Sequence, residues 1–188
     1  MQTRFALLLG ALTLAGCGFG PGTARYLPDA TPSEVRASAR VSTVEIIEVT
    51  LPSYAASEEI SVRGVDGAIR SSTDILWAED PESALVQSLV TNLSQITGAR
   101  VAADPWPLAD PAQVELTVRI ATMLVSADGR LDFVGQYAVA APDRAIRETV
   151  TPFAITESVN AASYQSIADA HARAWRQLSE EMAKRALR

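Results

Sequence analysis

The sequence contains only one cysteine, Cys17, and one histidine, His171. A metal cluster of Cys and His ligands needs several such residues and a disulfide needs two cysteines, so both are excluded within the chain. Positive charge is also scarce, with 16 Lys and Arg against 22 Asp and Glu, which gives a net charge of −6. Because phosphate contacts supply most of the affinity for nucleic acids, we expect no nucleic-acid partner.

Long hydrophobic runs are absent except near the N-terminus. The run from Phe5 to Ala15 follows a single positive charge, Arg4. It is too short for a transmembrane helix, which needs about 20 residues. A basic residue, a short apolar run and small residues after it are typical of a secretory signal peptide, which we assign to residues 1–16.

The signal peptide ends in Leu14-Ala15-Gly16-Cys17. This order resembles the lipobox of bacterial lipoproteins, in which two small residues precede a cysteine that is lipidated and becomes the first mature residue. The resemblance implies cleavage between Gly16 and Cys17, with diacylglyceryl and palmitate chains on Cys17. Because each buried methylene contributes about 0.8 kcal/mol, three such chains hold a protein firmly in a bilayer. The alternative is an ordinary signal peptide followed by an unmodified cysteine.

The residue after Cys17 is Gly18, where the common sorting rule places Asp in lipoproteins that stay in the inner membrane. Gly18 therefore favours an outer-membrane lipoprotein that faces the periplasm. Residues 17–40 begin with several Gly and Pro residues, and we expect them to form the lipidated cysteine and a flexible tether. Within this tether, Tyr26-Leu27 can pair as a short edge strand.

Residues 41–188 carry the periodicity of a single α+β domain. Two amphipathic segments, from Asp80-Pro81 to Gly98 and from 163 to 187, predict helices. Alternating or β-branched segments predict strands at 42–51, 60–64, 68–71, 100–103, 113–125, 131–139 and 146–156. Since each helix has one apolar face, we expect a two-layer sandwich with a mostly antiparallel sheet and both helices packed on one face.

Short local signals predict how these elements begin, end and turn. Asp80-Pro81 predicts a helix N-cap and first position, and Gly98 predicts a left-handed C-terminal residue. Asp66-Gly67 predicts a type I′ turn in a hairpin. The alternation shifts after Ile120, which predicts a β-bulge in that strand.

The residue types that carry catalysis form no recognisable motif. His171 lies in the apolar stripe of the last helix, where a core histidine with one hydrogen-bond partner is expected and a catalytic base is the alternative. No nucleophile elbow or phosphate-binding loop is present. The paired acidic residues lie at element edges or exposed faces (Glu58-Glu59, Glu79-Asp80 and Glu180-Glu181). We therefore expect no enzymatic activity, no catalytic residue, no cofactor and no metal.

Two tryptophans are candidates for contact with a partner or with lipid. Trp106 lies between two prolines in the loop 104–107, where it is either an exposed anchor or a cap on one end of the sheet. Trp77 ends a short apolar segment just before the first predicted helix. Trp175, in the stripe of the last helix, is expected in the core.

The order of these segments resembles the PqiC/YmbA-type family, the auxiliary lipoproteins of ABC transport systems built around MCE-domain proteins. The resemblance covers nearly the whole mature chain, and the order and spacing of weak motifs carry it. The matching pieces are the lipobox Leu14 to Cys17, Tyr26-Leu27, Val49 to Tyr54, Ile60 to Arg63, Leu76 to Glu79, the strand pair around Asp128-Gly129, and the Ala/Ser-rich terminal helix. The chain departs from the family pattern at Ala121-Thr122-Met123, where an aromatic is common, and at Tyr137, where Trp is common.

The resemblance implies a non-enzymatic part of a lipid shuttle between the inner and outer membranes. An MCE-domain protein would form the periplasmic conduit, and a permease with its ATPase would supply energy. This lipoprotein would dock the conduit at the outer membrane, and the sequence leaves self-association into a homo-oligomer open. Two alternatives are an outer-membrane assembly lipoprotein that binds a barrel protein or lipopolysaccharide, and a lipid-modified periplasmic enzyme.

Overall fold

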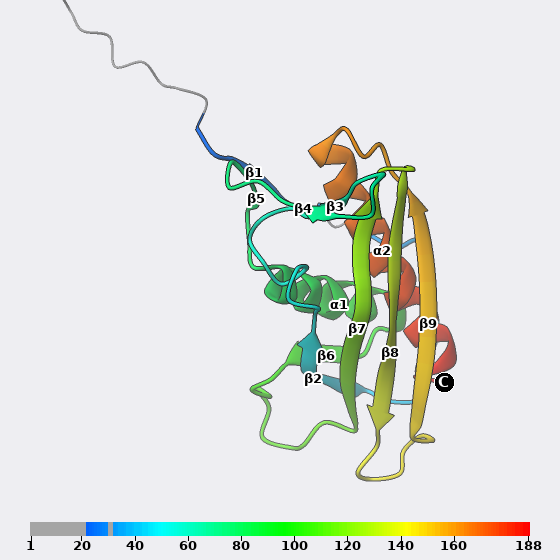
Figure 1. Ribbon diagram of the computed structural model, residues 1–188. Helices are drawn as coiled ribbons and strands as arrows, with labels where there is room; N and C mark the ends of the chain where they lie inside the picture. Colours follow the sequence, from blue (N-terminus) through cyan, green and yellow to red (C-terminus); the bar gives the residue numbers. More distant parts are fainter. Residues whose placement is uncertain (1–21, 30–31) are drawn as a thin grey trace, which may run out of the picture.

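The computed structural model describes residues 22–29 and 32–188 (Figure 1). The predicted signal peptide and lipobox lie outside the described residues. The elements follow in the order β1 (Ala24–Tyr26), β2 (Thr43–Thr50), β3 (Val62–Arg63), β4 (Ile69–Arg70), β5 (Ile75–Trp77), α1 (Pro81–Thr97), β6 (Arg100–Ala103), β7 (Val114–Ser126), β8 (Arg130–Ala140), β9 (Thr149–Ser158) and α2 (Tyr164–Arg185).

The main sheet is organised around β7, a strand of 13 residues. β8 and β9 extend it as an antiparallel meander, in which Val118 lies opposite Tyr137 and Tyr137 lies opposite Thr151. At the other edge of β7, β2 and β3 both pair in parallel, β3 with Val125 and Ser126 only. The two long antiparallel ladders confirm the predicted α+β class, whereas the parallel pairing of β2 has no local signal in the sequence.

Both helices pack on the same face of this sheet: α1 contacts β2 and β6, whereas α2 contacts β8 and β9 and lies behind them in Figure 1. The predicted caps of α1 are confirmed: the Asp80 side chain accepts a hydrogen bond from the Ser83 N–H, and Gly98 adopts φ 71°. Ser163 caps α2 in the same way by accepting from the Ser166 N–H. The two-layer sandwich expected from the helical stripes is therefore present.

The predicted bulge in β7 is confirmed between Ile120 and Thr122. Gly135 on β8 lies against this bulge, and a Cβ atom there would collide with the carbonyl oxygen of Arg119. The same atom would lie 3.0 Å from the Ile120 Cα and 3.1 Å from the ring of Phe153. Glycine is thus required here because the backbone of the bulge approaches β8 closely.

The turn between β3 and β4 differs from the predicted type I′ turn. That turn needs positive φ at both central residues, and the only non-glycine residue with positive φ in the described part is Arg144. Instead, the Gly67 N–H donates to the Gly64 carbonyl over 3.0 Å, and Gly67 adopts φ 83°. The two glycines allow a longer turn whose tip is Val65.

The predicted flexible tether is wrong for the described residues before 41, because their backbone groups are bonded to the domain. The strand predicted at Tyr26-Leu27 is present in part, because the observed strand β1 includes Tyr26 but ends before Leu27; β1 pairs in parallel with β5. Its Ala24 N–H donates to the Asp74 carbonyl over 2.8 Å, and Tyr26 packs against Tyr164 with ring centroids 5.7 Å apart.

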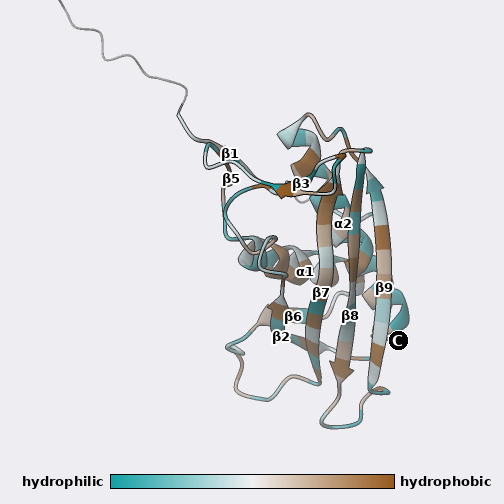
Figure 2. Cartoon of the chain, viewed as in Figure 1, coloured by the Kyte–Doolittle hydropathy of each residue, from teal (hydrophilic) through white to brown (hydrophobic). Residues whose placement is uncertain are grey.

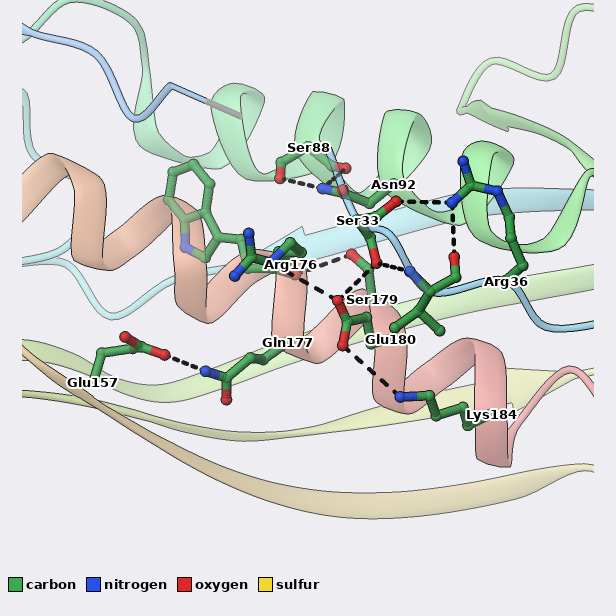
Figure 3. A network of polar contacts seen from close by, with 12 residues as sticks. Ser33, Arg36, Ser88, Asn92, Glu157, Arg176, Gln177, Ser179, Glu180 and Lys184 are labelled. Carbon is green, nitrogen blue, oxygen red and sulfur yellow. Dashed lines mark hydrogen bonds and ion pairs between the residues drawn. The ribbon is translucent and has the colours of Figure 1, made fainter. Parts of the chain in front are cut away.

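The segment 33–40 then runs along the helices. The Ser33 hydroxyl donates to a Glu180 carboxylate oxygen over 2.7 Å, next to Arg36 and Lys184 (Figure 3). Further along, the Ala37 N–H donates to the Ile96 carbonyl and the Arg40 N–H to the Leu187 carbonyl, both over 2.9 Å. The folded unit therefore begins by residue 24 rather than at residue 41.

His171 is a core residue, as expected, with 4% of its surface exposed. Its ring lies 5.0 Å from that of Trp77 and 6.1 Å from that of Trp175, measured between centroids. Its Nδ1 donates to the Ile167 carbonyl oxygen over 2.8 Å. Burial lowers the pKa of His171 to about 4, and this hydrogen bond opposes the shift only in part. The imidazole is neutral at pH 7.

We predict that His171 makes the fold sensitive to acid. The unfolded chain binds this proton near pH 6.5, whereas the folded chain binds it near pH 4, so stability is lost as pH falls between these two values. The loss from this group amounts to about 3 kcal/mol, since one pKa unit corresponds to about 1.4 kcal/mol. Urea unfolding at pH 7, 5.5 and 4 should show that the free energy of unfolding depends less on pH in His171→Gln than in the parent chain. An equally steep profile in the variant contradicts the assignment.

We also predict that Gly135→Ala lowers the free energy of unfolding by about 1–3 kcal/mol, because overpacking against a backbone carbonyl cannot be relieved by a side-chain rotation. The matched control is Gln136→Ala on the exposed side of the same strand, which should stay within about 0.5 kcal/mol of the parent chain. Equal stability of Gly135→Ala and the control, measured by urea titration, would show that the bulge is more pliable than described.

Candidate functional site

The first candidates for a site are clusters of acidic or metal-ligating side chains in the described part of the chain. No group of three or more His, Cys, Asp or Glu residues there is arranged to hold a metal ion. Neither α1 nor α2 is apolar enough over a sufficient length to cross a membrane. The acidic pairs noted in the sequence have structural partners: Glu58 lies 3.7 Å from Arg25, and Glu181 lies 3.1 Å from Arg185.

The most distinctive open surface is the side of β7–β9 that faces away from the helices. We call it the outer sheet face. Its exposed or partly exposed side chains include the small or apolar residues Ala121, Val134, Ala138, Val150, Pro152 and Ala154, and the polar residues Arg119, Gln136 and Thr156. Val150 is 65% exposed and Val134 is 37% exposed. Figure 2 shows hydrophobic residues along all three of these strands. A face of this kind, open to solvent without a polar cover, marks a contact surface.

The outer sheet face is shallow. Thr117, Ala138 and Val150 form one row across the three strands, and they line a hollow of about 240 Å³ together with Arg119 and Gln136. Small ligands are usually held in concave pockets that cover most of their surface. A broad, gently hollowed face suits another protein surface better than a small molecule.

The charge on this face is balanced. Arg119 on β7 lies 3.9 Å from the Glu48 carboxylate on β2, and both side chains are largely exposed. An exposed pair of this kind contributes little to stability. A second ion pair joins Arg130 and Asp132 of β8 over 3.6 Å, so the face carries two pairs of opposite charge beside its apolar residues.

Pro152 limits how the edge of this sheet can be used. In the main sheet β9 pairs with β8 alone, so its second edge is not engaged in the ladder. Pro152 lies within β9, opposite Gln136, and has no N–H to offer to an added strand. A partner is thus better accommodated on the outer sheet face than by extension of the sheet.

A second open feature, the end groove, lies at the end of the sheet where β2, β6 and β7 begin. It has a volume of about 600 Å³ and is lined by Ser42, Thr43, Arg100, Leu108, Ala109, Asp110, Pro111, Gln113 and Asp143. The Gln113 side-chain oxygen accepts from the Ser42 N–H over 2.7 Å, which joins two walls of the groove. Its lining combines one basic residue, Arg100, with two acidic residues, Asp110 and Asp143.

Trp106 organises the loop beside the end groove. Its indole Nε1 donates to the Asp110 carbonyl over 2.8 Å, and the ring remains partly exposed. Nearby on β2, burial raises the pKa of Glu45, and the charges of Asp104 and Glu115 raise it further. The hydrogen bond of Trp106 thus stabilises the loop conformation, and the exposed part of its ring can still contact a partner.

Trp77, the other tryptophan considered for partner or lipid contact, is buried instead. Only 6% of its surface is exposed, and its ring packs on His171. The pairing of β5 with β1 and the cover of α2 place it in the core, so its burial leaves little surface for a partner. Cys17 and Gly16 lie outside the described residues.

Sequence reasoning missed the two valines of the outer sheet face. The signal was the alternation in β9, where Phe153 and Ile155 are buried and the residues between them point the other way. Strict alternation assigns Val150 to the same outward side. Val150, an apolar residue at an outward position of this alternation, was therefore the signal in the sequence for an exposed apolar face.

Comparison with known structures supports the fold. An uncharacterised protein of known crystal structure is 22% identical, with 82% of this chain and 97% of that chain covered and a TM-score of 0.65. Protein XCC0632 from Xanthomonas campestris is 14% identical, with 87% and 95% covered and a TM-score of 0.64. The PelC dodecamer from Paraburkholderia phytofirmans has a TM-score of only 0.43 at 11% identity, so its assembly is not transferred to this chain. No curated protein is similar enough to count as a match.

The sequence itself matches a family model over residues 26–183, from β1 almost to the end of α2. The match spans the sheet, both helices and the N-terminal segment that packs on them. The chain belongs to the family of ABC-type transport auxiliary lipoprotein components.

Proposed function

We propose that this protein is an outer-membrane-anchored, non-enzymatic lipoprotein that docks the MCE-domain periplasmic protein of an ABC-type lipid transport system. The family supports a role in transport, and the lipobox ending at Cys17 supports an anchor. The single observation that carries the docking role is the uncovered outer sheet face, centred on Val150 with 65% of its surface exposed.

The anchor supplies the first half of this function. Acyl chains on Cys17 confine the domain to one membrane, and Gly18 favours the outer one. Confinement raises the effective concentration of the domain for any partner that reaches that membrane. A docking component can therefore act without a motor, a cofactor or a catalytic group of its own.

The outer sheet face supplies the second half. It is broad, shallowly hollowed and carried by three strands joined in long ladders, so a partner meets a surface that is already ordered. A rigid surface loses little conformational entropy on binding. The partly exposed Trp106 beside the end groove is a second contact point that we propose for the same partner.

We predict that Cys17→Ala, exported with a cleavable signal peptide, yields a folded domain that no longer fractionates with membranes and does not support lipid transport. The reason is that the acyl acceptor is lost while the described fold is untouched. Membrane fractionation, circular dichroism and a complementation assay measure these three properties. Full transport activity by a freely soluble variant would refute the anchoring role.

We further predict that Val150→Glu weakens binding to the MCE-domain protein at least about tenfold, because a buried carboxylate without a partner is costly in an interface. The matched control is Ser38→Glu, which adds the same charge to an exposed position on the helix side of the domain. Binding is measured by biolayer interferometry with both variants checked for unchanged thermal unfolding.

Two outcomes contradict the docking proposal. One is equal binding by Val150→Glu and Ser38→Glu, which excludes the outer sheet face. The other is a pull-down that recovers a barrel protein or lipopolysaccharide and no MCE component, which favours an assembly lipoprotein instead.

A further inference from the structure

The N-terminal segment leaves the domain from a fixed point. In β1, the Arg25 guanidinium donates to the Trp77 carbonyl over 3.0 Å and lies 3.7 Å from the Glu58 carboxylate. The Ala78 N–H donates to the Tyr26 carbonyl over 2.8 Å. These bonds fasten β1 to β5, so the chain that precedes Ala24 starts from a defined place on the surface.

That place is at the same end of the molecule as the β3–β4 hairpin. An isolated bridge joins Glu59, just before β3, to Leu76 of β5. β3 in turn pairs with Val125 and Ser126, the last residues of β7. The end groove lies at the first residues of β7, and Figure 1 shows β1 and the hairpin at the opposite end from the loop that joins β8 to β9.

The length of chain before β1 restricts which end can approach a bilayer. Six residues lie between Cys17 and Ala24, and the seven Cα–Cα steps from Cys17 to Ala24 span at most about 25 Å when the chain is fully extended. β7, with its 13 residues, is about 43 Å long at the usual rise per residue. If Cys17 is held in a bilayer, the β1 end stays near it, whereas the end groove can lie farther away than the tether can reach.

The same end carries unusually exposed apolar side chains. Val65, at the tip of the hairpin, is 97% exposed, and Leu27 and Ile69 are 43% and 42% exposed. These three are among only seven large hydrophobic residues that are exposed in the described part. We call Leu27, Val65 and Ile69 the apical cluster.

The hairpin carries an ion pair and one further basic residue beside the apical cluster. The Arg70 guanidinium lies 2.6 Å from the Asp66 carboxylate, which neutralises that pair. Arg63 is exposed and forms no ion pair with the described residues. A long basic side chain beside an apolar tip matches the headgroup region, where its charge reaches phosphates while its stem stays on apolar surface.

We propose that the apical cluster rests in the phospholipid headgroup region of the membrane that holds Cys17. The domain then stands with the long axis of β7 directed away from the bilayer, and the end groove and the outer sheet face project into the periplasm. This inference rests on the proposed anchor at Cys17. A single exposed valine binds too weakly to hold a protein alone, so the cluster orients a domain that the acyl chains retain.

The test uses the full lipidated protein in vesicles of phosphatidylethanolamine and phosphatidylglycerol. Val65→Cys and Leu108→Cys each add one free thiol, at the apical cluster and at the end groove, and an environment-sensitive fluorophore is attached there. Leu108 is a matched control because it is also an exposed apolar residue, 41% exposed. We expect a blue shift at position 65 and loss of about half its emission with headgroup-region spin-labelled lipids, and water-like emission at position 108.

Equal emission and quenching at positions 65 and 108 would overturn the orientation. Stronger quenching at a third label, Val150→Cys, would overturn it as well, because the sheet face would then lie on the bilayer. Flotation of the same samples separates the two proposals. Protein that floats without quenching at position 65 refutes the orientation alone, whereas protein that fails to float with the vesicles refutes the anchor and the orientation together.

Discussion

A sheet has two faces, and in this protein both helices pack on the same one. Leu85, Leu89 and Leu93 of α1 and Ile167 and Leu178 of α2 are buried against the inner side of the strands. The residues of β8 and β9 that point the other way lie on the side that neither helix covers. The outer sheet face follows from this one-sided packing, and the small and apolar side chains among its exposed residues make it suitable for a protein partner. A domain built in this way presents a contact surface without any moving part.

The N-terminal segment determines which end of the domain lies near the proposed membrane anchor. Its hydrogen bonds to β5 and to the two helices continue the fold almost to the anchor, so few residues remain between bilayer and domain. Residues that were expected to form a long flexible tether instead limit the reach of the domain. The proposed orientation thus depends on how the segment before β2 is bonded, since a longer loose tether would allow any surface to meet the membrane.

The sequence predicted the elements whose signals are local. Asp80 and Gly98 define the ends of α1 through capping, and the alternation around Ile120 reveals both β7 and its bulge. The parallel pairing of β2 with β7 could not be predicted, because it depends on contacts between segments about 70 residues apart. The packing of residues 33–40 was missed because this short segment after Pro32 has no clear hydrophobic periodicity. Its hydrogen bonds to the helical layer include those of backbone groups, such as the N–H groups of Ala37 and Arg40, which leave no trace in the sequence. Trp77 was misplaced for a related reason: a three-residue strand is too short to show which side is buried.

The account depends on a covalent anchor at Cys17 that holds a chemically passive docking domain at a membrane. Mass spectrometry of the mature protein, isolated from the membranes of a bacterial host that processes lipoproteins, tests this most directly. We expect an N-terminal peptide that begins at Cys17 and carries a diacylglyceryl group with an additional acyl chain. A mature N-terminus with an unmodified Cys17, or one cleaved elsewhere, would contradict the account.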